Sequence, residues 1–462
     1  MVTTREIIGN KKRFIALACI LAVVAAAYRY GTGGSSATQF IKGMAWWGDA
    51  LIFSFAAFSC LALAELVWRI ILVLIYRPIP GVSDDQLPTC TVVVPAYNEG
   101  RQVFDTLKSL ADSNYPREKI QLIAVDDGSV DDTWQWIKQA KRTLAVPVLT
   151  IRQPRNQGKR QALYDGFKRS TGKVLVTVDS DSMVEPDTIR NLVTPLAVNS
   201  GIGAVAGNVR VLNQTQGIIP RMLDIVFVFS FDFIRASQSM VRTVTCTPGA
   251  LSAYRKSAVI GVLDKWLNQT FLGRPANIGE DRALTNMILR QGYYVVFQQN
   301  AKVFTEAPVG YSQLCKMYLR WARSNVRETI AMTTFIFTRF RRASMLGARI
   351  NLVSDVIKLT VAQIFFLISW GLLLWHPAIF GTKAIIGIVL GSSLAATIYA
   401  LKFGRISSML AFVYGFFFFI ALTWIKPYAL ITPHHSRWMT RACPKTKVNP
   451  DLHHQLSARQ LS

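Results

Sequence analysis

The chain has 462 residues, of which 51% are hydrophobic and 17% are charged, and this composition excludes an intrinsically disordered protein. Its mean hydropathy of +0.27 is too high for an ordinary soluble enzyme, so part of the chain is expected in a membrane. The net charge of +25 is compatible with binding to a nucleic acid, an anionic lipid or a polyanionic substrate. Charge alone does not distinguish these partners. The six cysteines are scattered without a C-x-x-C pair, so neither a disulfide framework nor a structural zinc site is indicated.

Two apolar segments are expected to span the membrane near the N-terminus. The first, Phe14 to Ala27, follows several basic residues, a pattern that a secretory signal peptide shares. Because a second segment follows from Trp46 to Tyr76, we favour a membrane anchor. Glu65 in this second segment lies four positions before Arg69, which predicts either an internal ion pair or a residue that lines a path. The basic flanks place residues 80–345 in the cytoplasm.

The middle of the chain alternates short β-branched runs with helical stretches. The candidate strands are Thr91–Pro95, Gln121–Val125, Pro147–Ile151, Lys173–Val178, Gly203–Leu212 and Tyr294–Phe297. Such alternation is typical of a largely parallel sheet covered by helices. Sheets of this kind bind ligands at the carboxyl ends of their strands, so the residues that follow each strand are the first candidates for a site.

Aspartates follow two of these strands. Asp126 and Asp127 end the second strand, and Asp179 and Asp181 follow the fourth. Helix capping and ligand binding explain Asp127 equally well. Asp179 and Asp181, spaced by one residue at a strand end, can both reach a hard cation. Mg²⁺ or Mn²⁺ typically uses one or two carboxylates together with phosphate oxygens of the substrate.

Two further segments complete a candidate nucleotide site. Residues 156–160 open a helix whose N-terminus and Lys159 favour an anion, although a solvated first turn would look the same. Glu280 and Asp281 begin another helix, where they are either dipole-stabilising acids or a general base directed at an acceptor hydroxyl. The absence of a G-x-x-x-x-G-K-[ST] motif disfavours a P-loop enzyme, and no G-x-G-x-x-G follows the first strand.

The C-terminal third returns to the membrane. Between Tyr311 and Arg349, basic residues alternate with apolar ones, which predicts amphipathic helices in the membrane interface. Three spans are expected at Val353 to Trp375, Ala384 to Leu401 and Ser408 to Ile425. Three spans would leave the C-terminus outside, whereas its basic residues indicate the cytoplasm. A re-entrant segment around 427–433 would resolve this conflict.

Seven motifs stand between residues 90 and 330: Val94-Pro-Ala-Tyr-Asn-Glu99, Val125-Asp-Asp-Gly-Ser129, Asn156 to Arg160, Val178-Asp-Ser-Asp181, Thr247-Pro-Gly249, Gly279-Glu-Asp281 and Leu319-Arg-Trp-Ala-Arg-Ser324. Together they resemble those of membrane-integrated family 2 glycosyltransferases of the processive β-glycan synthase group. Hyaluronan synthases and chitin-oligosaccharide synthases are the most similar groups, and cellulose synthases are further away. The resemblance implies an α/β fold, with a cytoplasmic GT-A (Rossmann-like) glycosyltransferase domain flanked by transmembrane and amphipathic interface helices.

This resemblance divides the chain into five parts. They are two N-terminal transmembrane helices (1–80), the GT-A domain (81–310), interface helices (311–350), about three C-terminal transmembrane helices (351–433) and a cytoplasmic gating-type tail (434–462). The resemblance therefore implies a multi-pass protein of the inner or plasma membrane.

The resemblance also implies a role for each matching residue. Asp281 corresponds to the catalytic base, Arg320 to the arginine that neutralises the leaving diphosphate, and Trp321 to the aromatic floor under the acceptor sugar. Asp179 and Asp181 correspond to the D-x-D ligands of the nucleotide and of Mg²⁺ or Mn²⁺. The residues implied in substrate binding are Tyr97, Glu99, Asp126, Asp127, Lys159, Asp179, Pro248, Gly249, Glu280, Trp321, Arg323, Trp438 and Arg441.

Two positions depart from the family pattern. Met317 stands where the family's Q-x-x-R-W motif has glutamine, which puts the identity of the acceptor sugar in doubt. Trp438-Met-Thr-Arg441 resembles the W-G-T-R segment of hyaluronan synthases with one substitution, and this likeness supports a cytoplasmic C-terminus.

The expected function is inverting, processive transfer of sugar from a nucleotide-sugar donor, with uridine as the family's usual nucleotide, and secretion of the glycan through the protein's own pore. The expected partners are this donor, the growing glycan and the lipid bilayer, with room for accessory secretion proteins and no role for nucleic acid. The alternative is a non-processive enzyme that moves one sugar to a lipid carrier. A transporter or signalling protein that keeps only the fold is a third hypothesis. The sequence does not identify the donor sugar.

Overall fold

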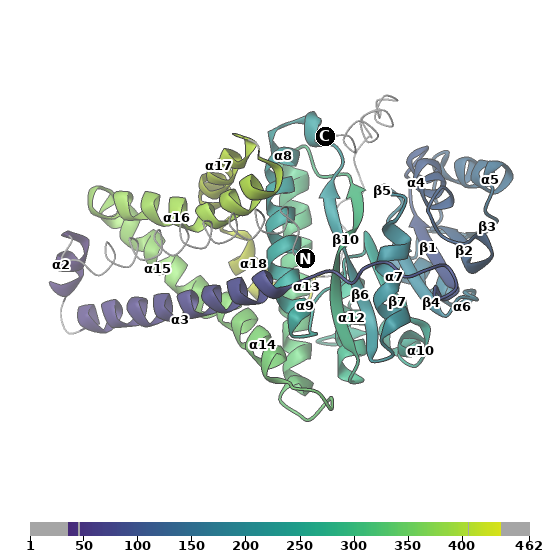
Figure 1. The fold of residues 1–462 in the computed structure, drawn as a ribbon. Coiled ribbons are helices and arrows are strands. Elements are labelled where there is room, and N and C mark those ends of the chain that lie inside the picture. The colour runs from purple at the N-terminus through teal and green to yellow at the C-terminus, as the bar shows by residue number, and fades with distance from the viewer. Residues whose placement is uncertain (1–35, 45–46, 405, 436–462) are drawn as a thin grey trace.

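The computed structural model describes residues 36–44, 47–404 and 406–435. Its ribbon has two parts: a sheet with helices packed on it, and a group of long apolar helices beside it (Figure 1). The predicted first span, Phe14 to Ala27, and the tail from residue 436 onward lie outside the described residues.

An eight-stranded mixed sheet forms the core of the first part, in the order β3-β2-β1-β4-β7-β6-β10-β5. Its strands are β1 (Cys90–Ala96), β2 (Ile120–Asp126), β3 (Val148–Arg152), β4 (Val174–Val178), β5 (Ser182–Val184), β6 (Ile202–Val211), β7 (Leu251–Arg255) and β10 (Tyr294–Thr305). Strands β1 to β4 pair in parallel, as do β6 and β10, whereas β7 runs antiparallel to both β4 and β6. Every residue of β1 and β4 is buried, as expected for strands covered on both faces.

The six strands predicted from the sequence are all present. The sequence pattern missed β7, because Leu-Ser-Ala-Tyr-Arg has no β-branched run, and it missed the short β5, which pairs antiparallel with β10. Strand β10 continues to Thr305 beyond the predicted end at Phe297, across polar residues and a shift in register. The sheet is therefore less parallel than the pattern indicated.

Helices α4 (Gln102–Ala111), α5 (Thr133–Thr143), α6 (Lys159–Lys168), α7 (Thr188–Val198) and α12 (Glu280–Arg290) pack on this sheet. Helix α6 begins at Lys159 and α12 at Glu280, so both predicted helix starts are confirmed.

A middle layer stands between the sheet and the apolar helices (Figure 1). It consists of α8 (Ile218–Val228), the π-helix η3 (Phe229–Arg235), α9 (Ala236–Met240) and α13 (Tyr311–Ile336). Helix α8 contacts β6 as well as α16 and α17, and α13 contacts α12 as well as α14 and α18. The predicted interface region is thus one long helix followed by a loop, and its Arg323 and Arg327 are buried in protein contacts.

Among the described residues, three helices are long and apolar enough to cross a membrane. They are α3 (Trp47–Ile75), the consecutive α14 (Leu346–Leu359) and α15 (Val361–Trp375), and α16 (Pro377–Phe403). A fourth candidate, 406–431, comprises α17 (Leu410–Phe417), η5 (Phe418–Leu422) and α18 (Ile425–Ile431), and bends by 43° before α18. Such a bend is compatible with a broken span or a re-entrant segment, and the re-entrant segment around 427–433 stays a prediction.

Glu65 links two of these helices. Its Oε1 accepts from Arg69 Nε at 2.7 Å, and also from Ser354 Oγ and Lys358 Nζ of α14, each at 2.6 Å. The ion-pair interpretation of Glu65 is therefore confirmed, and the carboxylate joins α3 to α14.

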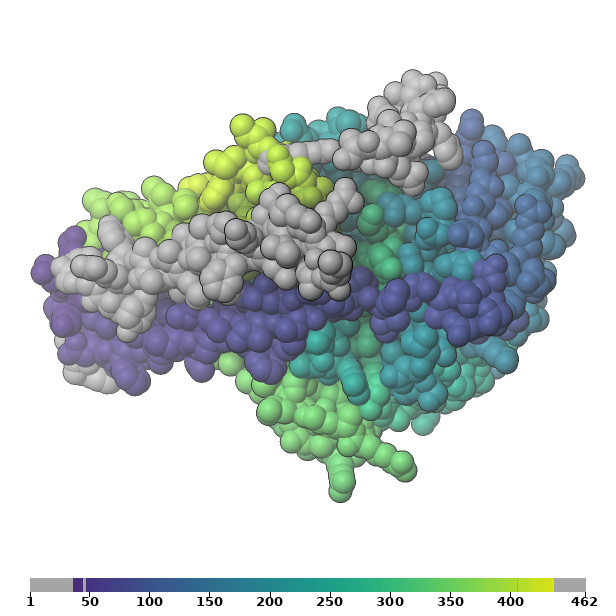
Figure 2. All heavy atoms as spheres, viewed as in Figure 1, coloured from purple at the N-terminus to yellow at the C-terminus, as the bar shows by residue number. Residues whose placement is uncertain are grey.

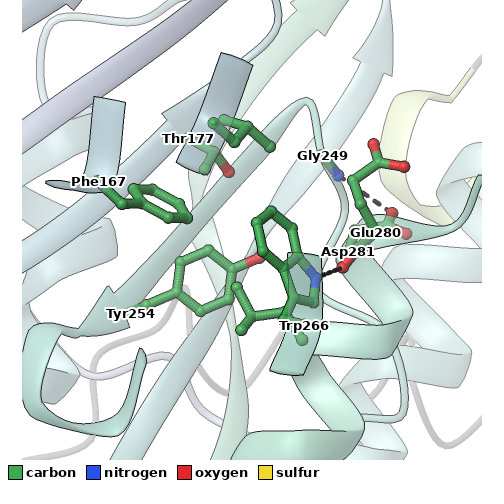
Figure 3. Close-up of a pocket in the computed structure, with 9 residues that line it drawn as sticks. Phe167, Thr177, Gly249, Tyr254, Trp266, Glu280 and Asp281 are labelled. Carbon is green, nitrogen blue, oxygen red and sulfur yellow. Dashed lines mark hydrogen bonds between the residues drawn. The ribbon is translucent and has the colours of Figure 1, made fainter. Parts of the chain in front are cut away.

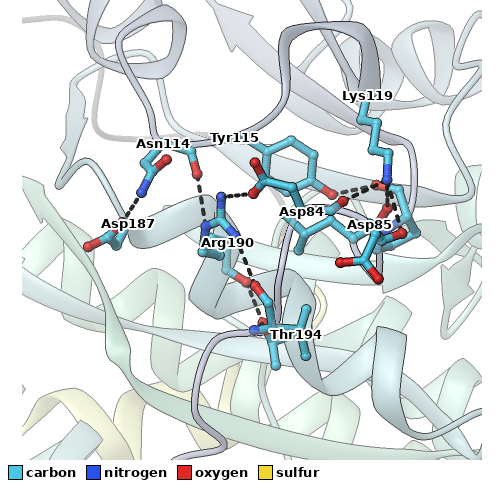
Figure 4. Close-up of polar contacts among 11 residues, drawn as sticks. Asp84, Asp85, Asn114, Tyr115, Lys119, Asp187, Arg190 and Thr194 are labelled. Atoms are coloured by element: carbon cyan, nitrogen blue, oxygen red, sulfur yellow. Dashed lines mark hydrogen bonds and ion pairs between the residues drawn. The ribbon is translucent and has the colours of Figure 1, made fainter.

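The chain between α3 and β1 is fastened to the surface of the sheet part (Figures 2 and 4); we call residues 79–87 the strap. Gln298 exchanges two hydrogen bonds with the backbone N–H and C=O of Ile79, at 3.2 and 2.5 Å. Lys119 Nζ donates to the carbonyl oxygens of Asp84, Asp85 and Leu87 at 2.7 to 3.1 Å. Arg190 donates to the Val82 carbonyl at 2.8 Å and pairs with the Asp84 carboxylate. The position of α3 is thereby tied to the sheet.

Candidate active site

A cavity of about 800 Å³ lies between the sheet and the apolar helices. It gathers predicted site residues from six separate segments of the chain. Those lining it are Glu99, Lys159, Asp179, Asp181, Pro248, Gly249, Glu280, Asp281, Arg320 and Trp321. The convergence on which the sequence interpretation depended is therefore present in the fold.

The two acids at the start of α12 are held in place by several contacts (Figure 3). Asp281 Oδ2 accepts from the Gly249 N–H at 3.3 Å, and its Oδ1 accepts from the Arg282 N–H at 2.7 Å. The carbonyl of Glu280 accepts from the indole N–H of the fully buried Trp266 at 2.8 Å. These bonds fix the orientation of the Asp281 carboxylate before any substrate binds.

Glu280 and Asp281 have opposite electrostatic environments. Burial raises the pKa of Asp281, and the neighbouring Glu280 carboxylate raises it further. Burial would also raise the pKa of Glu280, but the charges of Lys159 and Arg320 outweigh it, so that this pKa is lowered. Two adjacent acids whose pKa values are driven apart are a usual arrangement for a base and a charge partner.

Lys159 joins the two acidic motifs. Its Nζ lies 2.5 Å from Asp179 Oδ1 and 3.4 Å from Glu280 Oε1. Burial alone would lower the pKa of Lys159, but these two carboxylates raise it, so the ammonium stays charged. A Cβ at residue 249 would come within 2.5 Å of this ammonium, so glycine is the residue that leaves room for it.

Asp181 occupies the other end of the D-x-D motif. Its Oδ1 accepts from Thr305 Oγ1 at 3.2 Å and from Ser182 Oγ at 3.3 Å. Nowhere in the described parts of the chain do three or more His, Cys, Asp or Glu side chains form a site that could hold a metal unaided. Two carboxylates bordering a cavity suit a cation that takes its other ligands from a bound phosphate.

Helix α13 supplies Arg320 and Trp321. The Trp321 ring is 42% exposed and lies at centroid distances of 5.7 Å from Tyr318 and 6.1 Å from Phe227. The start of α12 is pressed against α13, because a Cβ on Gly279 would meet Ser324 Oγ at 1.7 Å. Gly279 also has a positive φ of 76°, so both the conformation and the space require glycine there.

Comparison with known proteins agrees with this arrangement. Residues 91–263 match the family model described as glycosyl transferase family 2. The chain is 29% identical to an N-acetylglucosaminyltransferase from Azorhizobium caulinodans over 84% of its length and 96% of that protein. It is also 29% identical to a hyaluronan synthase from Streptococcus pyogenes, over 83% of this chain and 90% of the other.

Residues 91–263 are thus a glycosyl transferase family 2 domain, and the chain is a glycosyltransferase. A solved mannosyltransferase from Pyrobaculum calidifontis has the same fold, with a TM-score of 0.55 and 19% identity over 82% of this chain and 97% of that one. The mixed sheet and its helices are therefore the GT-A (Rossmann-like) domain expected from the sequence.

Several predicted residues of this glycosyltransferase lie outside the lining of the cavity. Asp127 accepts from the backbone N–H groups of Gln157 and Gly158 at 2.7 and 2.9 Å, and so holds the loop before Lys159. Asp126 Oδ1 accepts from the Ser129 N–H at 3.0 Å, and its Oδ2 lies 3.3 Å from Arg152 Nε. These contacts give both aspartates a structural role in the present conformation.

The remaining predicted substrate-binding residues lie elsewhere in the chain. Tyr97 follows β1, is half-buried and does not line the cavity. Arg323 turns toward the end of α18, where it donates to Thr432 Oγ1 at 3.1 Å. Trp438 and Arg441 lie outside the described residues. Met317, which replaces the family's glutamine, is buried and lines the cavity.

The structure adds charged residues that the sequence interpretation passed over. Arg235, Asp355 and Lys426 line the same cavity, from η3, α14 and α18 respectively. A signal existed in the sequence, since each is a charged residue within or beside an apolar run. Only their position in the fold reveals that they border the cavity that contains Asp281.

Proposed function

We propose that this glycosyltransferase is an inverting, processive β-glycan synthase that uses a nucleotide-sugar donor, with uridine diphosphate as the carrier, and secretes its product. One observation carries the proposal. The cavity that contains Asp281 and Arg320 is also lined by residues of the apolar helices α14, η5 and α18. A glycan formed at Asp281 therefore has a route toward the membrane part without leaving the protein.

Inverting transfer needs one base, which removes the proton from the acceptor hydroxyl as its oxygen attacks the anomeric carbon. Asp281 suits this step, because its raised pKa makes it a better proton acceptor than an ordinary aspartate. Such general-base catalysis contributes about 10²- to 10⁴-fold. Arg320 in the same cavity would stabilise the negative charge that develops on the departing diphosphate.

Asp179 and Asp181 are the residues that would hold Mg²⁺ or Mn²⁺. The fit rests on a pair of carboxylates at the end of β4 that both line the cavity. The ion, when bound, would supply charge stabilisation of the diphosphate. Lys159 contacts Asp179, so its ammonium would lie beside the same phosphates.

The surroundings support a membrane location. With three apolar helices and a bent fourth segment, the protein would be a multi-pass protein of the inner or plasma membrane, with the GT-A domain in the cytoplasm where nucleotide sugars are made. Trp321, 42% exposed beside the cavity, would support the acceptor sugar by stacking. The names of the two relatives favour an N-acetylhexosamine among the donors.

The alternative, transfer of one sugar to a lipid carrier, predicts a different product. Purified protein in lipid nanodiscs is incubated with radiolabelled nucleotide sugars, singly and in pairs, with Mg²⁺ or Mn²⁺. A ladder of water-soluble polymer on a gel is expected. A single product that is extracted into organic solvent would instead establish the lipid-carrier reaction.

Asp281→Asn tests the assigned base. The substitution keeps the shape of the side chain but removes its basicity, so polymer synthesis should fall by about 10²-fold or more. Asp112→Asn, an exposed aspartate after α4, is the matched control and should retain wild-type synthesis. Unchanged turnover in Asp281→Asn would exclude Asp281 as the base.

A further inference from the structure

Met317 leaves the cavity without a polar group that the family's Q-x-x-R-W motif provides. Its buried thioether lines the cavity and has no hydrogen to donate. A sugar that stacks on the Trp321 ring still presents hydroxyl groups at its edges, and polar groups removed from water need hydrogen-bond partners. The acceptor therefore needs a polar contact from a side chain other than that of residue 317.

Tyr318, the next residue along α13, also lines the cavity. Its ring meets that of Trp321 edge-on, with 5.7 Å between the centroids and 82° between the planes. Tyr318 thus stands directly beside the ring proposed to support the acceptor sugar. It is placed to contact a glycan that has one sugar on Trp321.

The hydroxyl of Tyr318 is bonded to the apolar helix α17. It lies 2.8 Å from the hydroxyl of Tyr414, and either oxygen can be the donor. Tyr414 stands four residues before Phe418, which lines the cavity, and the centroids of these two rings are 6.0 Å apart. Because residues four apart share a face of a helix, the hydroxyl pair lies where the cavity reaches α17 and η5.

The proton count leaves this pair incomplete. Two tyrosine hydroxyls carry two protons, and the bond between them uses only one. Within the described parts of the chain, neither hydroxyl has another hydrogen-bond partner. Tyr318 lines the cavity and Tyr414 does not, so a bond donated by Tyr414 leaves the proton of Tyr318 available to a ligand. Such a bond also strengthens Tyr318 as a donor.

We propose that Tyr318 donates a hydrogen bond to a hydroxyl or ring oxygen of the glycan, and that Tyr414 is the positioning residue that orients this donor. The pair supplies the polar contact that Met317 cannot make. The proposal rests on the proposed function, because it requires a glycan that stays in the cavity between additions. The contact is made to an uncharged sugar oxygen and needs no acidic group on the product.

Tyr318→Phe keeps the ring beside Trp321 and removes the hydroxyl. A glycan that has lost one hydrogen bond dissociates more often between additions, so the mean polymer length should fall about fivefold. The donor KM should stay at its wild-type value, because the hydroxyl does not contact the donor. Both are measured on the full-length protein in lipid nanodiscs, with the nucleotide sugars and cation that give polymer in the wild type. A role confined to folding would lower the amount of active enzyme without shortening each chain.

Variants of Tyr414 test the positioning role. Tyr414→Phe should also shorten the polymer, because the hydroxyl of Tyr318 loses its fixed orientation. The double variant should give polymer no shorter than Tyr318→Phe alone, since Tyr414 acts only through Tyr318. Tyr164→Phe is the matched control: its hydroxyl donates to the exposed Asp264 at 2.8 Å, away from the cavity, and full-length polymer is expected.

Met317→Gln tests the exchange between the two positions. Added to Tyr318→Phe, it returns an amide to the first position of the motif and should lengthen the polymer again. Wild-type polymer length in Tyr318→Phe, additive shortening in the double tyrosine variant, or no recovery with Met317→Gln would each overturn the proposal while processive synthesis stands. A wild type that forms only a single lipid-linked sugar would overturn the proposed function, and this proposal with it.

Discussion

At the scale of single residues, the acid pair Glu280 and Asp281 explains how one site can hold an ionised carboxylate beside the proposed base, Asp281. Lys159 lies 3.4 Å from Glu280 and keeps that carboxylate ionised. The resulting negative charge disfavours a second one next to it, so Asp281 binds a proton more readily. In the proposed mechanism, Glu280 acts on the reaction through Asp281.

The pH dependence of the rate tests this relation. In wild type, kcat/KM should fall on acidification through the pKa of Asp281, which lies above its ordinary value of 3.8. Glu280→Gln removes the neighbouring negative charge, so the pKa of Asp281 falls and the acid limb should move to lower pH. An acid limb that stays in place in Glu280→Gln, measured as initial rate against pH, would remove Glu280 from this role.

At the scale of elements, α13 connects the acid pair at the start of α12 to the bent apolar segment that ends in α18. The buried Arg327 donates from Nη2 to the Ile278 carbonyl at 2.5 Å and from Nη1 to the Pro433 carbonyl at 3.2 Å. Ile278 lies two residues before Glu280, and Pro433 follows α18. Arg327 is therefore a positioning residue that joins the start of α12 to the end of α18.

Replacing Arg327 separates positioning from charge. Lysine keeps the charge but cannot reach both carbonyls as a planar fork does. Arg327→Lys should lower kcat about tenfold or more, because small displacements of a base are costly, with little change in the donor KM. The exposed Arg339→Lys serves as the control. Full kcat in Arg327→Lys would show that the contact only stabilises the fold.

The elements also show what the sequence can and cannot predict. The starts of α6 at Lys159 and α12 at Glu280 follow from local patterns, because glycine and the first-turn residues mark a helix start in any fold. Strand β7 and the contact of Arg327 with Pro433 depend on partners far along the chain, which periodicity does not reveal. Asp127 belongs to the same class, because its strand end left helix capping and ligand binding equally open, and only the fold shows that it accepts from two backbone amides.

At the scale of the whole molecule, one cavity is lined by both the GT-A domain and the apolar helices. The domain therefore has to keep one orientation relative to these helices. Two connections provide this orientation on different sides of the domain. Helix α13 packs between α12 and α18, and the strap fastens the end of α3 to β10, to α7 and to the start of β2 (Figures 1 and 4). The strap contains no residue that lines the cavity, so its contribution can be measured apart from catalysis.

The strap predicts an order of stabilities. Gln298 is 1% exposed, and Gln298→Ala would leave the backbone N–H and C=O of Ile79 without their partner, at a cost of about 1–3 kcal/mol. Lys119→Met should cost less, because water can replace the ammonium at the exposed carbonyls of Asp84 and Asp85. The midpoint of thermal unfolding, followed by tryptophan fluorescence in nanodiscs, should therefore fall further for Gln298→Ala, while kcat well below that midpoint stays at the wild-type value in both variants. The reverse order of midpoints, or a loss of kcat in folded Gln298→Ala, would mean that the strap does more than fix the domain, because catalysis would then depend on how α3 is held.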